Sequence, residues 1–477
     1  MAVICIICEG AYPYIVGGVS SWVHDIISSN PEHQFKLLCI IPNKEFAKLK
    51  YKLPENVVSL NNIILDPEID FSILQVLKNK ILESREREEA VKELLNFNGE
   101  ISDKILQTID KIFEKNIGKP LEVILSKDYW NALVENYEKN YSGKNFNMYY
   151  WTYRNIILNL ILIGQSEIPK ADIYHPVAAG YAGYVAALAG HRRLGRVVLT
   201  EHGIYPRERE EEIIIAKWID REFKGIWIDY FYYLSKLAYS YSDRIISLFE
   251  YNRQAQISNG AQREKTLVIP NGIDPKIYSN IVREKREGFH VGSILRVVPI
   301  KDVKMMIKGF KLMVQRVKNA KLWIIGPYEE DREYYEECRQ LVEDLKLQDV
   351  VEFTGAVDVK EYYKFLDVVI LSSISEGQPL SILEAMAVGI PIITTDVGNC
   401  REIVKGWKEI GEAGSVIPPT SYIELGEELI KFAHNPQKLK EYGENGKRIV
   451  QEKYRKSDYI EKYKEIYREL GEKKWQE

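Results

Sequence analysis

The stretch Ser375-Glu376-Gly377-Gln378-Pro379-Leu380-Ser381-Ile382-Leu383-Glu384-Ala385-Met386-Ala387 connects an apolar strand to a helix. We predict the strand at Val368–Leu371 and the start of the helix near Pro379, since proline is favoured in a first helical turn. Glu376 then lies in the loop, and Glu384 lies one turn into the helix. This order indicates an open α/β sheet, in which ligands bind outside the carboxyl ends of parallel strands.

Alternation of strands and helices extends over most of the chain and predicts parallel sheets with crossover helices. Apolar strand segments of the first half are Val3–Cys8, Phe35–Ile41, Ile173–His175, Arg196–Thr200, Arg244–Ser247 and Thr266–Ile269. Those of the second half are His290–Ile294, Leu322–Ile325, Val350–Phe353, Val368–Leu371, Ile390–Thr394 and Ser415–Ile417. We expect helices to begin near Asp302, Asp331, Asp358, Pro379 and Ser421.

The length of 477 residues exceeds what one hydrophobic core supports, so we expect two doubly wound, Rossmann-like domains facing each other across a cleft. The first is predicted at 1–278 and the second at 289–455, with the charged stretch 279–288 as a linker. A C-terminal helix at 456–477 is expected to cross back to the first domain. A Lys- and Glu-rich segment at about 66–165, with Ile73, Leu74, Leu77, Ile81, Leu94 and Leu95 at helical spacing, is predicted to be a helical insertion.

Composition is that of an ordinary globular protein, with 45% hydrophobic and 28% charged residues. A net charge of −4 gives no reason to expect nucleic-acid binding. The N-terminus has no basic region before its apolar run, and no apolar run approaches the length of about 20 residues that crosses a bilayer. Five cysteines in so long a chain favour a reducing compartment, and we expect a cytoplasmic protein.

Two further loops contain residues suited to binding phosphate. Gly17-Gly18, before an amphipathic helix, would let backbone N–H groups approach a phosphate, although a tight turn with positive φ also explains such glycines. Arg296 and Lys301 lie between a strand and a helix, where two cations suit a diphosphate; a solvated basic turn is the alternative. Neither a G-x-G-x-x-G nor a G-x-x-x-x-G-K-[ST] pattern occurs, which argues against dinucleotide and P-loop sites.

The spacing of Glu376 and Glu384 resembles the E-x7-E signature of family-4 glycosyltransferases of the GT-B type; an acidic pair at a helix N-terminus is the alternative. The order of Gly17-Gly18, the turn 271–274, Arg296 with Lys301, and the two glutamates follows that layout. The resemblance implies that Glu376 contacts the donor sugar and Glu384 the nucleotide ribose. It also implies a donor site formed by Gly17, Gly18, Arg296, Lys301, Glu376, Gly377, Pro379, Leu380 and Glu384.

Several segments resemble more narrowly the cytosolic glycosyltransferases of Pel exopolysaccharide systems. They are Glu9-Gly10 with Tyr12-Pro13-Tyr14, Tyr174-His175 with Gly180–Gly183, Thr200–Tyr205 with Arg207–Arg209, and Ser375–Pro379. This resemblance implies a retaining, metal-independent transferase that adds a sugar from a UDP-sugar to a growing polysaccharide. His202, Glu376, Arg296 and Lys301 are then the catalytic candidates, and a polysaccharide export complex that recruits the protein to the inner face of the membrane is a candidate partner.

Metal-dependent transferases commonly hold their ion with a D-x-D motif, and no such motif occurs in the sequence. Arg296 and Lys301 can instead stabilise the negative charge of the leaving diphosphate. His202 follows a strand and is placed to reach a ligand, although a structural histidine is the alternative. Arg207 and Arg209 are weaker candidates for binding the acceptor or a phosphate. The aromatic segment 226–234 fits a buried helix better than a surface for a membrane partner or an acceptor glycan. A UDP-sugar epimerase, a transferase with another acceptor and a nucleotide-sugar-binding regulatory subunit stay open.

Overall fold

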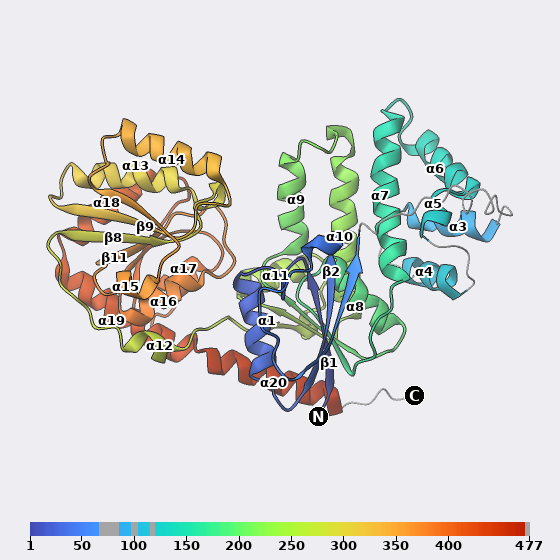
Figure 1. Cartoon of the computed structure of the whole chain (residues 1–477), viewed down its shortest axis with the longest axis horizontal. Helices are drawn as coiled ribbons and strands as arrows, with labels where there is room; N and C mark the ends of the chain where they lie inside the picture. The colour runs from blue at the N-terminus through green and yellow to red at the C-terminus, as the bar shows by residue number, and fades with distance from the viewer. Residues whose placement is uncertain (66–84, 97–103, 115–119, 473–477) are drawn as a thin grey trace. The chain divides into compact units, whose positions relative to one another are not determined.

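The computed structural model describes residues 1–65, 85–96, 104–114 and 120–472 (Figure 1). The chain folds into two compact units. The first comprises Met1–Val268 together with the C-terminal stretch from Tyr463, and the second comprises Ile269–Lys462. The boundary at Val268 lies before the predicted linker at 279–288, which is part of the second unit.

The first unit contains a seven-stranded parallel sheet in the order β3-β2-β1-β4-β5-β6-β7. Its strands are β1 (Val3–Glu9), β2 (Gln34–Ile41), β3 (Val57–Ile64), β4 (Ile173–Pro176), β5 (Arg196–Glu201), β6 (Arg244–Ser247) and β7 (Thr266–Val268). Its helices are α1 (Gly18–Ser28), α3 (Arg85–Leu94), α4 (Lys104–Glu114), α5 (Pro120–Ile124), α6 (Lys127–Asn140), α7 (Phe146–Gly164), α8 (Tyr181–His191), α9 (Tyr205–Ile215), α10 (Lys224–Tyr241) and α11 (Glu250–Ser258).

The predicted strands of this unit are confirmed, but β3 was missed. Its sequence, Val57-Val58-Ser59-Leu60-Asn61-Asn62-Ile63-Ile64, has no continuous apolar run, and only Ile63 is fully buried. β3 is an edge strand, which is exposed on one side and does not need the apolar residues of a central strand.

In the described parts of the segment after β3, helices α3 to α7 follow one another with short turns between some of them (Figure 1). Leu94 and Leu95 are buried, as their spacing predicts, whereas Ile73, Leu74, Leu77 and Ile81 lie outside the described residues. The helices share one hydrophobic core with α8 and α10. The aromatic segment 226–234 lies in α10 and is largely buried, as predicted.

The second unit has a six-stranded parallel sheet in the order β10-β9-β8-β11-β12-β13. The strands are β8 (Phe289–Ile294), β9 (Ala320–Ile325), β10 (Val351–Gly355), β11 (Val368–Leu371), β12 (Ile392–Thr395) and β13 (Gly414–Ile417). The helices are α12 (Pro275–Ser279), α13 (Val303–Val314), α14 (Arg332–Asp344), α15 (Val359–Tyr363), α16 (Leu380–Val388), α17 (Cys400–Lys405), α18 (Tyr422–Ala433), α19 (Pro436–Lys453) and α20 (Lys456–Glu472). The predicted strands and helix starts are confirmed.

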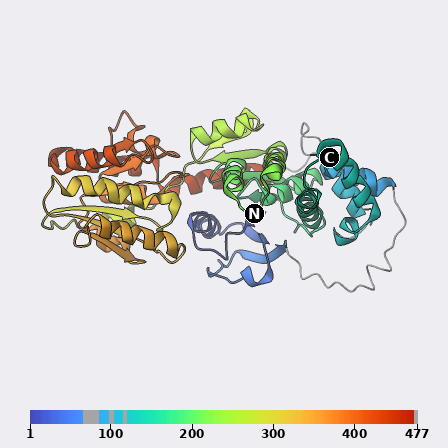
Figure 2. The same ribbon diagram turned by 90° about the horizontal axis from the view of Figure 1, so that it is seen from above.

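Helices cover both faces of this second sheet, as both views show (Figures 1 and 2). The core on one face contains residues of α13, α14 and α18, and the core on the other contains residues of α16, α17 and α19. Neighbouring residues of β11 alternate between these cores, with Ile370 in one and Leu371 in the other. A strand buried on both faces needs apolar residues at every position, which explains why these strands are visible in the sequence.

The last helix, α20, begins in the second unit and ends in the first. Tyr463 and Tyr467 anchor its second half, since their hydroxyl groups bond to Thr200 and His175 at 3.0 and 2.7 Å. Among the described residues, no helix is long and apolar enough to span a membrane.

Candidate active site

Two loops at the carboxyl edge of the second sheet are joined by an ion pair between Lys301 and Glu376. Lys301 ends a short 3-10 turn after β8, and Glu376 lies in the loop between β11 and α16. The Ser373 hydroxyl donates a hydrogen bond of 2.5 Å to the same carboxylate. The backbones of the two loops are also joined, by the bond of 2.8 Å from Ile374 N to Ile300 O. The structure therefore brings together two predicted site residues.

Arg296 lies in the same loop as Lys301 but has a different partner. Its guanidinium donates to both carboxylate oxygens of Glu330, at 2.7 and 2.6 Å, and 55% of the side chain is exposed. In the structure the partner of Arg296 is thus a surface carboxylate, that of Glu330, rather than Glu376. Surface ion pairs of this kind contribute little stability, so the guanidinium can exchange Glu330 for another anion at low cost.

Glu384 lies one turn into α16, as predicted, and is partly buried. The Tyr363 hydroxyl donates to its carboxylate at 3.2 Å, and Tyr278 forms a second side-chain hydrogen bond with it. Burial raises the pKa of the Glu384 carboxyl above its ordinary value, while the hydrogen bonds from Tyr278 and Tyr363 act in the opposite direction. Neither tyrosine stood out in the sequence, because nothing about a tyrosine in a short helix marks it as a partner of a distant glutamate.

The other predicted residues of this loop shape its backbone. Pro379 is the N-cap of α16, Leu380 is its first residue, and the Gly377 carbonyl accepts a hydrogen bond of 3.2 Å from Asn399 N. Gln378 binds the turn before α12 twice, accepting from Asn271 N at 2.8 Å and donating to Asn271 O at 2.9 Å. The Glu376 loop is thereby fixed to the segment that carries Tyr278.

In the first unit, Gly17 and Gly18 begin α1 and are exposed. Gly17 has a φ of 178°, and Gly18 is not among the residues with positive φ, so the explanation by a positive-φ turn is wrong. A Cβ atom at either glycine would meet none of the described residues within 4 Å. The space beside the α1 N-terminus is therefore open, as binding of an anion to its N–H groups requires.

His202 follows β5 and packs against the Trp22 ring, with ring centroids 4.9 Å apart at an angle of 76°. Its Nε2 atom is buried and has no hydrogen-bond partner among the described residues. Burial lowers the pKa of His202 to about 4, so the ring is neutral at pH 7. Buried polar atoms are normally paired, so the unpaired Nε2 atom of His202 is an exception within the described part of the chain.

Three of the segments that resemble Pel-system enzymes, those around Glu9, Gly180 and Tyr205, meet at the carboxyl edge of the first sheet. The Glu9 carboxylate accepts hydrogen bonds from the Tyr205 hydroxyl at 2.7 Å and from Ala182 N at 3.3 Å. Gly180 is required there, because a Cβ atom would lie 2.0 Å from the Tyr205 ring. The Arg209 guanidinium lies 5.4 Å from the centre of that ring. Arg207 instead pairs with Glu211 on the surface of α9.

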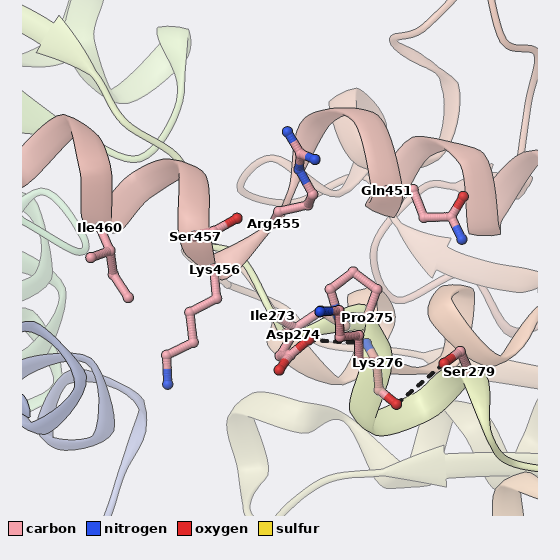
Figure 3. A pocket seen from close by; sticks show the side chains of 10 residues that line it. All are labelled: Ile273, Asp274, Pro275, Lys276, Ser279, Gln451, Arg455, Lys456, Ser457 and Ile460. Carbon is pink, nitrogen blue, oxygen red and sulfur yellow. Dashed lines mark hydrogen bonds between the residues drawn. The ribbon is translucent and has the colours of Figure 1, made fainter. Parts of the chain in front are cut away.

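A separate pocket of about 540 Å³ lies in the second unit, beside the junction of α19 and α20 (Figure 3). Its lining residues are Ile273, Asp274, Pro275, Lys276, Ser279, Gln451, Arg455, Lys456, Ser457 and Ile460. Asp274 caps α12 by accepting from Lys276 N at 3.0 Å, and Arg455 is paired with Asp458. Since none of the predicted site residues lines it, we regard it as a consequence of packing between the turn 271–274 and the helix junction.

Comparison with known proteins gives two family matches. Residues 2–264 match the model described as a domain of unknown function (DUF3492), and residues 276–449 match the model of glycosyl transferases group 1. The second unit therefore carries a group 1 glycosyltransferase domain, and the chain is a glycosyltransferase.

Relatives and solved structures agree with this result. The capsular polysaccharide biosynthesis glycosyltransferase CapM of Staphylococcus aureus is 23% identical over 324 residues, which are 65% of this chain and 80% of CapM. An MMP alpha-(1->4)-mannosyltransferase from Mycolicibacterium hassiacum is 24% identical over 260 residues, 53% of this chain and 60% of that protein. The crystal structure of Anabaena HepE in complex with UDP covers 98% of this chain and 100% of its own, with a TM-score of 0.61 and 16% identity. The fold is GT-B.

Proposed function

We propose that this chain, which belongs to the family of the domain of unknown function DUF3492, is a retaining glycosyltransferase that uses a UDP-sugar and no metal ion. The observation that supports the proposal best is the arrangement at the carboxyl edge of the second sheet. A cation on one loop, Lys301, is paired with Glu376 on the next, and the partly buried Glu384 follows in the adjoining helix.

In this proposal each of these groups meets a different part of the donor. Lys301 and Arg296 face the diphosphate, Glu376 the sugar hydroxyls, and Glu384 the ribose hydroxyls. The bond between the sugar and the diphosphate oxygen breaks, the acceptor oxygen forms the new glycosidic bond on the same face, and the leaving diphosphate takes up the acceptor proton. Fixed cations that stabilise the charge of the leaving group lower the barrier to this step.

The first unit contributes groups of another kind. The open N-terminus of α1 at Gly17 and Gly18 can supply N–H groups to the diphosphate, and His202 can supply a neutral imidazole to the sugar. A neutral ring donates or accepts one hydrogen bond without adding a charge beside the reacting centre. We assign His202 to the chemical step and the second unit to nucleotide binding.

A growing exopolysaccharide is the acceptor that we favour. The resemblance of the segments around Glu9, Gly180 and Tyr205 to Pel-system transferases supports it, as does the similarity to a transferase of capsular polysaccharide biosynthesis. The proposed setting is the cytoplasmic side of the membrane, with an export complex as partner.

The proposal is tested by incubating the protein with a panel of nucleotide sugars, with and without a polysaccharide acceptor, and measuring the release of UDP. We expect release from UDP-glucose or a UDP-N-acetylhexosamine, stimulated by the acceptor, with an α-linked product from an α-linked donor. The Glu376→Gln variant should still bind UDP, but it should release little UDP from the UDP-sugar donor. An altered sugar configuration after incubation with a UDP-sugar alone would establish an epimerase instead, and release from GDP- or ADP-sugars only would refute the choice of donor.

A further inference from the structure

Two tyrosine hydroxyls from different helices converge on the Glu384 carboxylate. Tyr363 ends α15 and is fully buried, and its hydroxyl lies 3.2 Å from Oε2 of Glu384. Tyr278 lies on α12 and also forms a hydrogen bond with this carboxylate. The two rings contact each other edge to face, with centroids 6.3 Å apart. Glu384 is therefore held by a pair of aromatic side chains that support each other.

The Glu384 carboxylate can accept more hydrogen bonds than the two tyrosines donate. An ionised carboxylate has about four lone-pair sites, and the tyrosines occupy two of them. Two sites remain on a side chain that is still partly exposed, so they are accessible to a ligand. A ribose ring presents two adjacent hydroxyl donors, O2′ and O3′, which match the two free sites in number. A 2′-deoxyribose ring fills one of them.

We propose that Tyr278 and Tyr363 orient the Glu384 carboxylate so that it binds both ribose hydroxyls, and that this arrangement selects ribonucleotide over 2′-deoxyribonucleotide donors. The inference rests on the proposed function, because it takes a nucleotide as the ligand of Glu384. Tyr278 and Tyr363 are positioning residues, which act through Glu384.

The position of Tyr278 is itself fixed by contacts with the Glu376 loop. The turn before α12 is bonded through Asn271 to Gln378, two residues after Glu376. On its other side, Ile273 pairs with the start of α20 through the bond of 2.8 Å from Lys456 N to Ile273 O. These hydrogen bonds fix the turn that precedes α12. The Tyr278 hydroxyl therefore stays within reach of Glu384.

The tyrosines also affect the charge of the site. Burial raises the pKa of the Glu384 carboxyl, whereas the two tyrosine hydrogen bonds and the charge of Lys360 lower it. Loss of one hydroxyl should therefore raise the pKa of Glu384 further. The carboxylate that accepts the ribose hydrogen bonds would then become protonated at a higher pH than in the wild-type protein.

The experiment measures the affinities of the full chain for UDP and for 2′-deoxy-UDP by calorimetric titration, in the wild type and in Tyr278→Phe and Tyr363→Phe. Each variant keeps the ring and its packing, which a thermal unfolding scan verifies. We expect UDP affinity to fall by about two- to tenfold, the factor that one hydrogen bond is typically worth. The affinity for 2′-deoxy-UDP should fall less, so that the preference for UDP shrinks. As the pH is lowered below 7, the UDP affinity of each variant should begin to decline at a higher pH than that of the wild type.

Tyr362→Phe is the matched control, since Tyr362 is the neighbour of Tyr363 in α15 but packs against Trp323, at 5.6 Å between ring centroids. It should change neither affinity. An unchanged or tighter affinity for UDP in both test variants would overturn the inference, and so would an equal loss for the two nucleotides. If the wild type binds no UDP at all, the proposed function fails as well; if it binds UDP while the variants keep its preference, only the role of the tyrosines is refuted.

Discussion

Lys301 and Glu376 form an ion pair across two loops, and only 17% and 12% of their side chains are exposed. Before any donor arrives, the cation already holds the carboxylate that we assign to the sugar. A bound diphosphate would share the Lys301 ammonium group with Glu376. The ammonium group would thereby fix the diphosphate and the Glu376 carboxylate relative to each other. Arg296 differs, because its exposed pair with Glu330 can be given up at little cost.

Lys301→Ala should weaken UDP binding and slow turnover together, because its charge would meet the diphosphate both before and during bond cleavage. Charge-assisted hydrogen bonds contribute about 1.5–3 kcal/mol, so we expect UDP affinity to fall by roughly tenfold or more. Titration with UDP and steady-state turnover measure the two effects. Lys304→Ala is the matched control: Lys304 is nearby on α13 but pairs with Glu337 at the surface. Equal effects of the two substitutions would contradict the assignment.

Turnover should survive an excess of EDTA. Within the described residues, no group of three or more His, Cys, Asp or Glu side chains could hold a metal ion. The expectation itself rests on Lys301 and Arg296, whose charges take the place of a divalent ion beside a diphosphate. The measurement is UDP release after dialysis against EDTA, with and without added Mg²⁺ or Mn²⁺. Loss of activity that a metal ion restores would refute this account.

The sequence was sufficient for most of the fold because both sheets are parallel and their central strands are buried on both faces. Such strands are nearly continuous apolar runs, as in Val368–Leu371, and they stand out from the polar segments between them. The strand β3 was not predicted because it lies at a sheet edge and has polar residues at Ser59, Asn61 and Asn62. β3 therefore lacks the apolar run by which the other edge strands, β7, β10 and β13, were predicted.

The candidate site was predictable in part. The strand–loop–helix pattern placed Glu376 and Lys301 at one sheet edge, where the structure joins them. Their pairing with each other, and that of Arg296 with Glu330, depends on side-chain directions that a sequence does not give. Tyr278 and Tyr363 were missed for a similar reason, because they reach Glu384 from separate helices far away in the sequence.

Glu201, at the end of β5, should make the stability of the first unit depend on pH. Burial raises the pKa of its carboxyl to about 7, against an ordinary value of 4.5. The folded state thus binds a proton more tightly than the unfolded state, so the stabilisation from this proton is complete below about pH 4.5 and is lost as the pH rises through 7. Chemical denaturation at a series of pH values should show stability declining over this range.

Glu201→Gln should flatten that decline, because the amide does not titrate. The Gln256 side chain donates to Glu201 Oε2 at 2.8 Å, and its own Oε1 atom is buried with no partner among the residues that the structure describes. A flip of the Gln256 amide would present Oε1 to the new NH2 group and preserve the bond. Glu210→Gln, a change in the same unit, is the control and should keep the pH dependence of the wild type. The same slope in all three proteins would rule out Glu201 as its source.

His202→Ala should reduce turnover by on the order of 10²-fold, the cost of losing one transition-state contact, and should leave UDP affinity nearly unchanged. The reason is that the side chains proposed to bind the nucleotide, Arg296, Lys301 and Glu384, lie in the second unit, whereas His202 lies in the first. Because its pKa is lowered to about 4, the ring acts as a neutral hydrogen-bonding group, and kcat should not show a titration near pH 6.5 that the variant lacks.

His202→Gln provides the matched comparison, since an amide also offers one donor and one acceptor to a ligand and should restore part of kcat. The paired measurement is UDP affinity by titration and kcat at saturating donor, on the wild type and both variants. Trp22, which packs against the ring, stays in place in each, so a lower thermal stability should be similar in the two variants. If His202→Ala abolished UDP binding but kept its turnover rate, or if His202→Gln were no better than alanine, the imidazole would have no direct part in the transfer step.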